Sequence, residues 1–109
     1  MDRRPVSADT QRRYDEIAAG LAGAGVKAST MFGMPTLKRN GKAIGGLWGD
    51  AMTFKLAPDT LAEALRLEGA QQFDPSGLGR PMKAWVVVPL AQSREWDRLA
   101  QLALAASDT

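Results

Sequence analysis

The chain has 109 residues, of which 45% are hydrophobic and 24% are charged, as expected for one globular domain with its own core. It contains no cysteine and no histidine, which excludes disulfides, thiolate nucleophiles, sulfur-ligated zinc and the usual general base near neutral pH. The net charge is only +2, but residues 26–56 carry five cations and one acid. We therefore expect a non-enzymatic protein with a modest basic region and with no cofactor or metal.

No apolar run approaches the roughly 20 residues that a membrane-spanning helix needs, and no signal-sequence pattern follows the amino terminus. We expect a cytoplasmic protein made of a single domain over residues 1–109. The short segments 1–6 and 107–109 are predicted to be poorly ordered tails.

A first helix is predicted from Ser7 or Asp9, because either side chain can cap it, to the glycines at 23 and 25. One apolar stripe follows helical spacing and is expected to face the core: Tyr14, Ile17, Ala18 and Leu21.

Four strands joined by short turns are predicted next, over residues 27–32, 35–39, 42–48 and 52–56. Asn40-Gly41 is a strong hairpin signal, since both residues tolerate positive φ. Gly45 and Gly46, inside the third strand, indicate a bulge, a bend or a close approach of another backbone. In the fourth strand, apolar residues alternate with Thr53 and Lys55, which is typical of a half-buried strand.

A second helix is predicted to begin at Pro58 and end at Gly69, with Leu61, Ala64 and Leu65 buried. Residues 71–73 are predicted as a short strand and residues 74–79 as a loop. The strongest strand signal lies between Pro81 and Pro89, with apolar residues on both faces that predict cover on both sides. Ser93 is expected to cap a last helix, whose buried face carries Trp96, Leu99, Ala100 and Ala103.

This order, helix, four strands, helix, one or two strands, helix, predicts an α+β fold. The sheet would be a single antiparallel one, made of a meander plus the later strands, with helices packed against it.

Two clusters of side chains are candidates for binding. Lys38, Arg39 and Lys42 surround the Asn40-Gly41 turn and would place three cations at a hairpin tip, able to contact a phosphate backbone or a protein partner. The alternative is that these charges only keep a sheet end soluble.

The second cluster consists of Lys55, Arg80, Lys83 and Trp85. If their strands pair, they would present cations around an aromatic ring and suit an anionic or planar ligand. The alternative is that Trp85 belongs to the core and the cations only rim it. No catalytic residue and no metal ligand is predicted.

Two separated stretches, Met31–Pro35 and Arg80–Pro89, together with the Gly41-Lys42 turn, Trp48 and Phe54–Leu56, resemble the amino-terminal domain of the TfoX/Sxy family of bacterial competence regulators. The chain is especially similar to small stand-alone proteins of the TfoX-N-like type, over residues 10–105. Met34 departs from the family pattern, which often has a second glycine there.

The resemblance implies an α+β fold with one antiparallel sheet and no catalytic residues. Full-length TfoX proteins are coactivators of competence genes with a second domain, for which these 109 residues have no room. The related YjbR-like proteins are described as possible DNA binders.

We therefore predict a binding or regulatory domain that contacts a protein or nucleic acid, as a monomer or a homodimer. The alternative is a small-molecule binding module with its pocket near Trp85 and Lys55. The sequence does not identify the partner.

Overall fold

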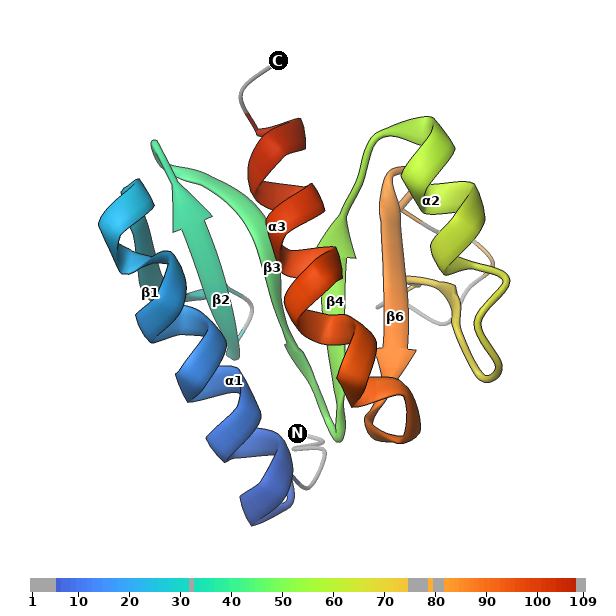
Figure 1. Ribbon diagram of the computed structural model, residues 1–109, viewed down its shortest axis with the longest axis horizontal. Helices are drawn as coiled ribbons and strands as arrows, with labels where there is room; N and C mark the ends of the chain where they lie inside the picture. The colour runs from blue at the N-terminus through green and yellow to red at the C-terminus, as the bar shows by residue number, and fades with distance from the viewer. Residues whose placement is uncertain (1–5, 32, 75–78, 80–81, 108–109) are drawn as a thin grey trace.

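The computed structural model describes residues 6–31, 33–74, 79 and 82–107. Three α-helices, two 3-10 helices and six strands succeed one another along this part of the chain (Figure 1). Their bounds are α1 (Ala8–Leu21), η1 (Ala22–Ala24), β1 (Val26–Met31), β2 (Met34–Arg39), β3 (Lys42–Trp48), β4 (Ala51–Lys55), α2 (Pro58–Ala64), β5 (Gln71–Gln72), β6 (Trp85–Pro89), η2 (Leu90–Glu95) and α3 (Trp96–Ala106).

The six strands form one sheet in the order β1-β2-β3-β4-β6-β5, and every neighbouring pair is antiparallel. The three α-helices lie on the same side of this sheet (Figure 1). The predicted α+β class with a single antiparallel sheet is therefore confirmed. Within the described residues, no helix has the length and apolar character needed to cross a membrane.

The core lies between the sheet and the helices. Met52, Phe54, Val86 and Val88 point from β4 and β6 to this side and are at most 1% exposed. From α3, the fully buried Trp96 packs against them, and its indole Nε1 donates a hydrogen bond to the Val88 carbonyl at 3.2 Å. Because this donor is satisfied, the largest side chain of the core is buried at little polar cost.

The predicted start of α1 is confirmed at Ser7. Its Oγ accepts a hydrogen bond from the Thr10 amide at 3.2 Å and so caps the helix. The Ser7 amide donates to Oδ1 of Asp50, in the β3–β4 turn, at 2.6 Å. This bond is the main cause that lowers the pKa of the Asp50 carboxyl, because it favours the charged form. The two contacts tie the beginning of α1 to one end of the sheet.

The β2–β3 hairpin forms as predicted, with positive φ at Asn40 (54°) and Gly41 (79°). Inside β3, a Cβ on Gly45 would lie 2.8 Å from the Thr53 carbonyl oxygen, and one on Gly46 would lie 2.5 Å from that of Pro35. The register between β2 and β3 also shifts after Leu37, leaving Ile44 as the extra residue of a bulge. Both the close approach and the bulge that the paired glycines indicated are therefore present.

The prediction for the last strand is wrong in two respects: where the strand begins, and that both of its faces are buried. Residues 82–84 form a turn, closed by a 3.0 Å hydrogen bond from the Trp85 amide to the Met82 carbonyl, so β6 begins at Trp85. Val86 and Val88 are buried, whereas Trp85 and Val87 are only half-buried. The cause is that the helices cover one side of the sheet only.

Other boundaries also differ from the predictions. α2 ends at Ala64 instead of Gly69, and of its predicted stripe only Ala64 is fully buried. Ser93 does not cap α3, because it lies within η2 and the residue before α3 is Glu95. The Ser93 carbonyl accepts a hydrogen bond from Arg13. Thr53 is 4% exposed although its pattern predicted a solvated position, since other side chains cover that part of the outer face.

Tyr14 of α1 is 4% exposed, and its hydroxyl has no hydrogen-bond partner among the described residues. Burial disfavours the charged phenolate and, with a smaller contribution from Asp15, raises the pKa of Tyr14 from 10.0 to about 12.

We predict that the added methyl of Gly46→Ala destabilises the fold by about 2–3 kcal/mol, because the Pro35 carbonyl must move away from it. Thermal unfolding followed by circular dichroism should show a midpoint lower by roughly 10–20 °C. Gly23→Ala is the matched control, since nothing lies within 4 Å of a Cβ there. An unchanged midpoint for Gly46→Ala would contradict the close approach.

We also predict that the chain's single tyrosine ionises with a pKa of about 12 in the folded protein. Since the folded-state pKa is raised, the stabilising contribution is complete below pH 10 and is lost as the pH rises towards 12. Phenolate absorbance against pH measures the midpoint, with a urea-unfolded sample as the reference. A folded protein that titrates with the unfolded midpoint would show that Tyr14 is not buried.

Candidate functional site

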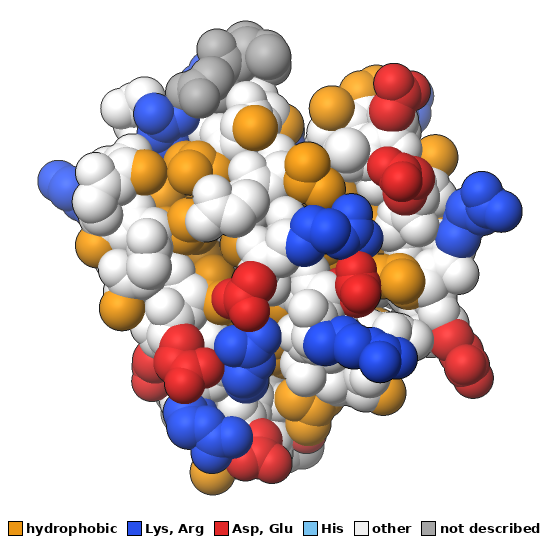
Figure 2. All heavy atoms as spheres, in the orientation of Figure 1, with side chains coloured by type: hydrophobic (Ala, Val, Ile, Leu, Met, Phe, Trp, Pro, Cys, Tyr) orange, Lys and Arg blue, Asp and Glu red, His pale blue; other side chains and the backbone are white. Residues whose placement is uncertain are grey.

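The charged residues are separated between the two layers of the molecule. The six strands contain five cations and no acid: Lys27, Lys38, Arg39, Lys42 and Lys55. On the helix side, acidic and basic side chains are intermixed (Figure 2). Several of them form surface ion pairs, including Arg13–Asp97 at 3.0 Å and Arg98–Glu95 at 2.8 Å. The cationic excess of the chain therefore resides on the sheet.

Three of the strand lysines share the face that the helices leave open. Leu37 and Phe54 point to the core, so Lys38 and Lys55, their neighbours in sequence, point the other way. Lys27 lies directly opposite Lys38 in the β1–β2 register and faces the same side.

β4 and β6 are paired, and Trp85 lies directly opposite Lys55 in their register. Lys83 is exposed in the turn before β6. Of the second predicted cluster, the structure thus brings Lys55 and Trp85 together and places Lys83 nearby in sequence. The position of Arg80 falls outside the described residues.

Aromatic rings lie on the same open face. Trp48 and Phe73 meet edge to face with ring centroids 5.1 Å apart, and Phe73 and Trp85 follow at 6.2 Å. Phe73 is buried between its neighbours, whereas the two tryptophans are half-buried and Met82 is 38% exposed. A hollow of about 40 Å³ lies between Trp85, Phe73 and the glycines of β3. The open face therefore combines lysines with partly accessible rings.

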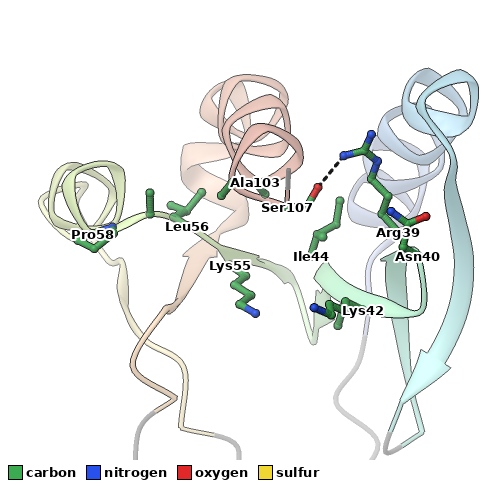
Figure 3. A pocket seen from close by; sticks show the side chains of 12 residues that line it. Arg39, Asn40, Lys42, Ile44, Lys55, Leu56, Pro58, Ala103 and Ser107 are labelled. Carbon is green, nitrogen blue, oxygen red and sulfur yellow. Dashed lines mark hydrogen bonds between the residues drawn. The ribbon is translucent and has the colours of Figure 1, made fainter. Parts of the chain in front are cut away.

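The first predicted cluster does not form one patch. Arg39 points to the helix side, where its Nε donates to the Ala24 carbonyl at 3.1 Å and its Nη1 to Ser107 Oγ at 3.0 Å. Lys38 points to the open face, and the Lys42 side chain ends on the side away from α3, although Lys42 pairs with Arg39 in the register (Figure 3). The β2–β3 hairpin also sits between β1 and β4 inside the sheet, so it does not protrude as a wing.

A cavity of about 340 Å³ lies at this end of the sheet, between β3, β4 and the end of α3 (Figure 3). Arg39, Lys42 and Lys55 are among its lining residues. Within the described part of the chain, no group of three or more acidic side chains could hold a metal ion. The site is therefore cationic and has no cluster of metal ligands.

Sequence reasoning missed Lys27, Trp48 and Phe73 as members of the open face. Lys27 was available from the hairpin, because a short turn at Gly33 puts residues 27 and 38 opposite each other. The aromatic contacts had no such signal, since Trp48 ends β3 whereas Phe73 follows β5, and these two strands are not neighbours in the sheet.

Comparison with protein-family models, with curated proteins and with solved structures found no match for this chain. The family resemblance thus stays a prediction from the residues that carry it.

We predict that Arg39 is structural, whereas its neighbour Lys38 is not. Arg39→Gln removes two charge-assisted hydrogen bonds that join β2 to the ends of η1 and α3, so we expect a loss of about 2 kcal/mol. Lys38→Gln, with the same charge change one residue away, should unfold within about 0.5 kcal/mol of wild type. Urea denaturation of both variants measures the difference, and equal midpoints would refute the assignment.

Proposed function

We propose that this chain is a non-enzymatic domain that binds single-stranded nucleic acid across the open face of its sheet. The observation that carries the proposal is the absence of any acidic residue from the six strands, together with lysines and half-buried tryptophans on the uncovered side. Cations beside aromatic rings on an open sheet face are a common arrangement for binding a phosphate backbone and stacking bases.

The spacing of these groups suits an extended strand of nucleic acid. Lys27 and Lys38 lie on β1 and β2, while Lys55 and Trp85 lie on β4 and β6. With about 4.8 Å between neighbouring strands, this row is roughly 19 Å long, enough for several nucleotides. The ligand would cross the strands with phosphates near the lysines and a base against Trp85.

A sheet face without a protruding element favours a single strand over a duplex. Reading the grooves of a duplex takes an element that enters them, such as a helix or a protruding ribbon. The β2–β3 hairpin is enclosed between neighbouring strands, and the three α-helices carry six acids against three arginines. Bases that are already unpaired can stack on a surface of this shape.

We also propose that the chain is related to the TfoX amino-terminal domains. Its role would be regulatory and cytoplasmic, exerted by binding nucleic acid or a protein partner. The support for this proposal is the resemblance of the two motif stretches and the agreement between the implied fold class and the sheet described above.

The rival function, a small-molecule pocket between Lys55 and Trp85, is less well supported. The hollow beside Trp85 is only about 40 Å³, whereas ligand pockets usually reach at least about 300 Å³. At this position the structure offers a surface for stacking instead of an enclosed site.

The test is fluorescence anisotropy of labelled mixed-sequence oligonucleotides, single-stranded and duplex, from low to physiological salt. We expect tighter binding of the single strand. Changing Lys27, Lys38 and Lys55 to Gln should lower the slope of log affinity against log salt by about 2, since each neutralised phosphate contributes roughly 0.7.

The matched control changes three exposed arginines on the helix side, Arg12, Arg66 and Arg94, to Gln, which alters the net charge equally. Its binding should stay close to wild type. An equal loss of affinity in both variants would mean that binding depends only on net charge and not on the open face. No binding at low salt would also refute the proposal.

A further inference from the structure

We propose that the cavity between β3, β4 and α3 is a binding site for a small organic anion with an apolar body, of the aromatic or branched aliphatic carboxylate class. The volume of about 340 Å³ lies within the usual range of small-molecule sites. This inference does not depend on nucleic-acid binding, because it rests on the cavity, although Lys55 takes part in both proposals.

The cavity exists because two neighbouring strands separate. β3 and β4 pair from Trp48 and Ala51 as far as Gly45 and Phe54, and the register ends there. Beyond this point the Ile44 bulge redirects β3, while β4 continues towards Pro58 and α2. The space between the two strands opens beneath the last turns of α3 (Figure 3).

Seven of the twelve residues that line the cavity are apolar. Ile44 of β3 and Leu56, the residue after β4, line the cavity from its two sides, and Pro58 lies where α2 begins. Small side chains leave the space open on the remaining sides, at Ala43, Ala57, Ala103 and Ala106. An apolar group of a ligand would replace water against these walls, which is favourable in proportion to the area that it covers.

The rim is cationic, and no acidic side chain is among the described residues that line the cavity. In Figure 3, the ends of the Lys42 and Lys55 side chains lie at the mouth on the side away from α3, whereas Arg39 reaches up to Ser107. Opposite charge on the ligand is the complement of such a rim.

The orientation of the ligand follows from the same geometry. The carbonyl end of α3, at Ser107, carries partial negative charge and disfavours an anion beside it. We therefore place the carboxylate at the Lys42–Lys55 mouth and the apolar body against Ile44 and Leu56. This polarity requires one charged end and one apolar end, which inorganic phosphate lacks.

The test is a titration of the folded, ¹⁵N-labelled chain with phenylacetate, followed by amide chemical shifts. We expect saturable shifts within residues 39–44, 55–57 and 103–107. Phenylacetamide, with the same shape and no charge, and inorganic phosphate, with charge and no apolar body, should each bind about tenfold more weakly or worse.

Two variants decide between the proposal and its alternatives. Lys42→Gln with Lys55→Gln should weaken phenylacetate binding by about tenfold and leave phenylacetamide unchanged, since only the charge is lost. Lys27→Gln with Lys38→Gln, which lies outside the cavity, is the charge-matched control and should bind like wild type.

Three results would overturn the inference. These are no saturable shifts at about 10 mM phenylacetate, shifts that cluster away from the cavity, or equal binding of phenylacetate and phenylacetamide. None of them bears on the oligonucleotide experiment, so the two proposals fail separately.

Discussion

The distortion of β3 is the constraint on which the rest of the structure depends. Gly45 and Gly46 let the backbones of Thr53 and Pro35 approach closer than any side chain allows, and the bulged Ile44 lies directly beside them. These three residues bend β3 in the middle of the sheet. On the helix side the bend separates β3 from β4 and leaves the cavity, and on the other side it leaves a hollow over which Phe73 and Trp85 lie.

The second determinant is that all three α-helices pack on one side. The buried side chains of β4 and β6 anchor α3 through Trp96, and the caps at Ser7 and Arg39 fix where α1 and η1 meet the sheet. Phe73 and Met82 lie on the uncovered face, where the Met82 amide donates a hydrogen bond to the Phe73 carbonyl at 2.8 Å. The open face is thus partly shielded without a layer of helices.

Much of this fold was predictable from local signals. Ser7, Asn40-Gly41 and the glycine pair act through their own backbone preferences, which sequence displays directly. The sequence did not show that only one face of β6 is covered. The pattern of side chains along a strand shows which residues are apolar, but it does not show on which side of the sheet the helices pack. The candidate site was likewise predictable only in part. The register that places Lys55 opposite Trp85 follows from the pairing of their strands. The structural role of Arg39 depends on a hydrogen bond to the end of α3, which is far away in sequence.

The separation of charge has a consequence for chemical modification. All five lysines of the chain lie on the strands or in the turn before β6, and four of them are exposed, while the charged groups of the helices are arginines and acids. An acetyl group transferred to a lysine side chain removes its positive charge. Acetylation of the lysines would therefore leave Arg39 as the one charged side chain of the strands and would not change the charges of the helices. A single enzyme acting on surface amines would in this way change the electrostatics of one side of the protein.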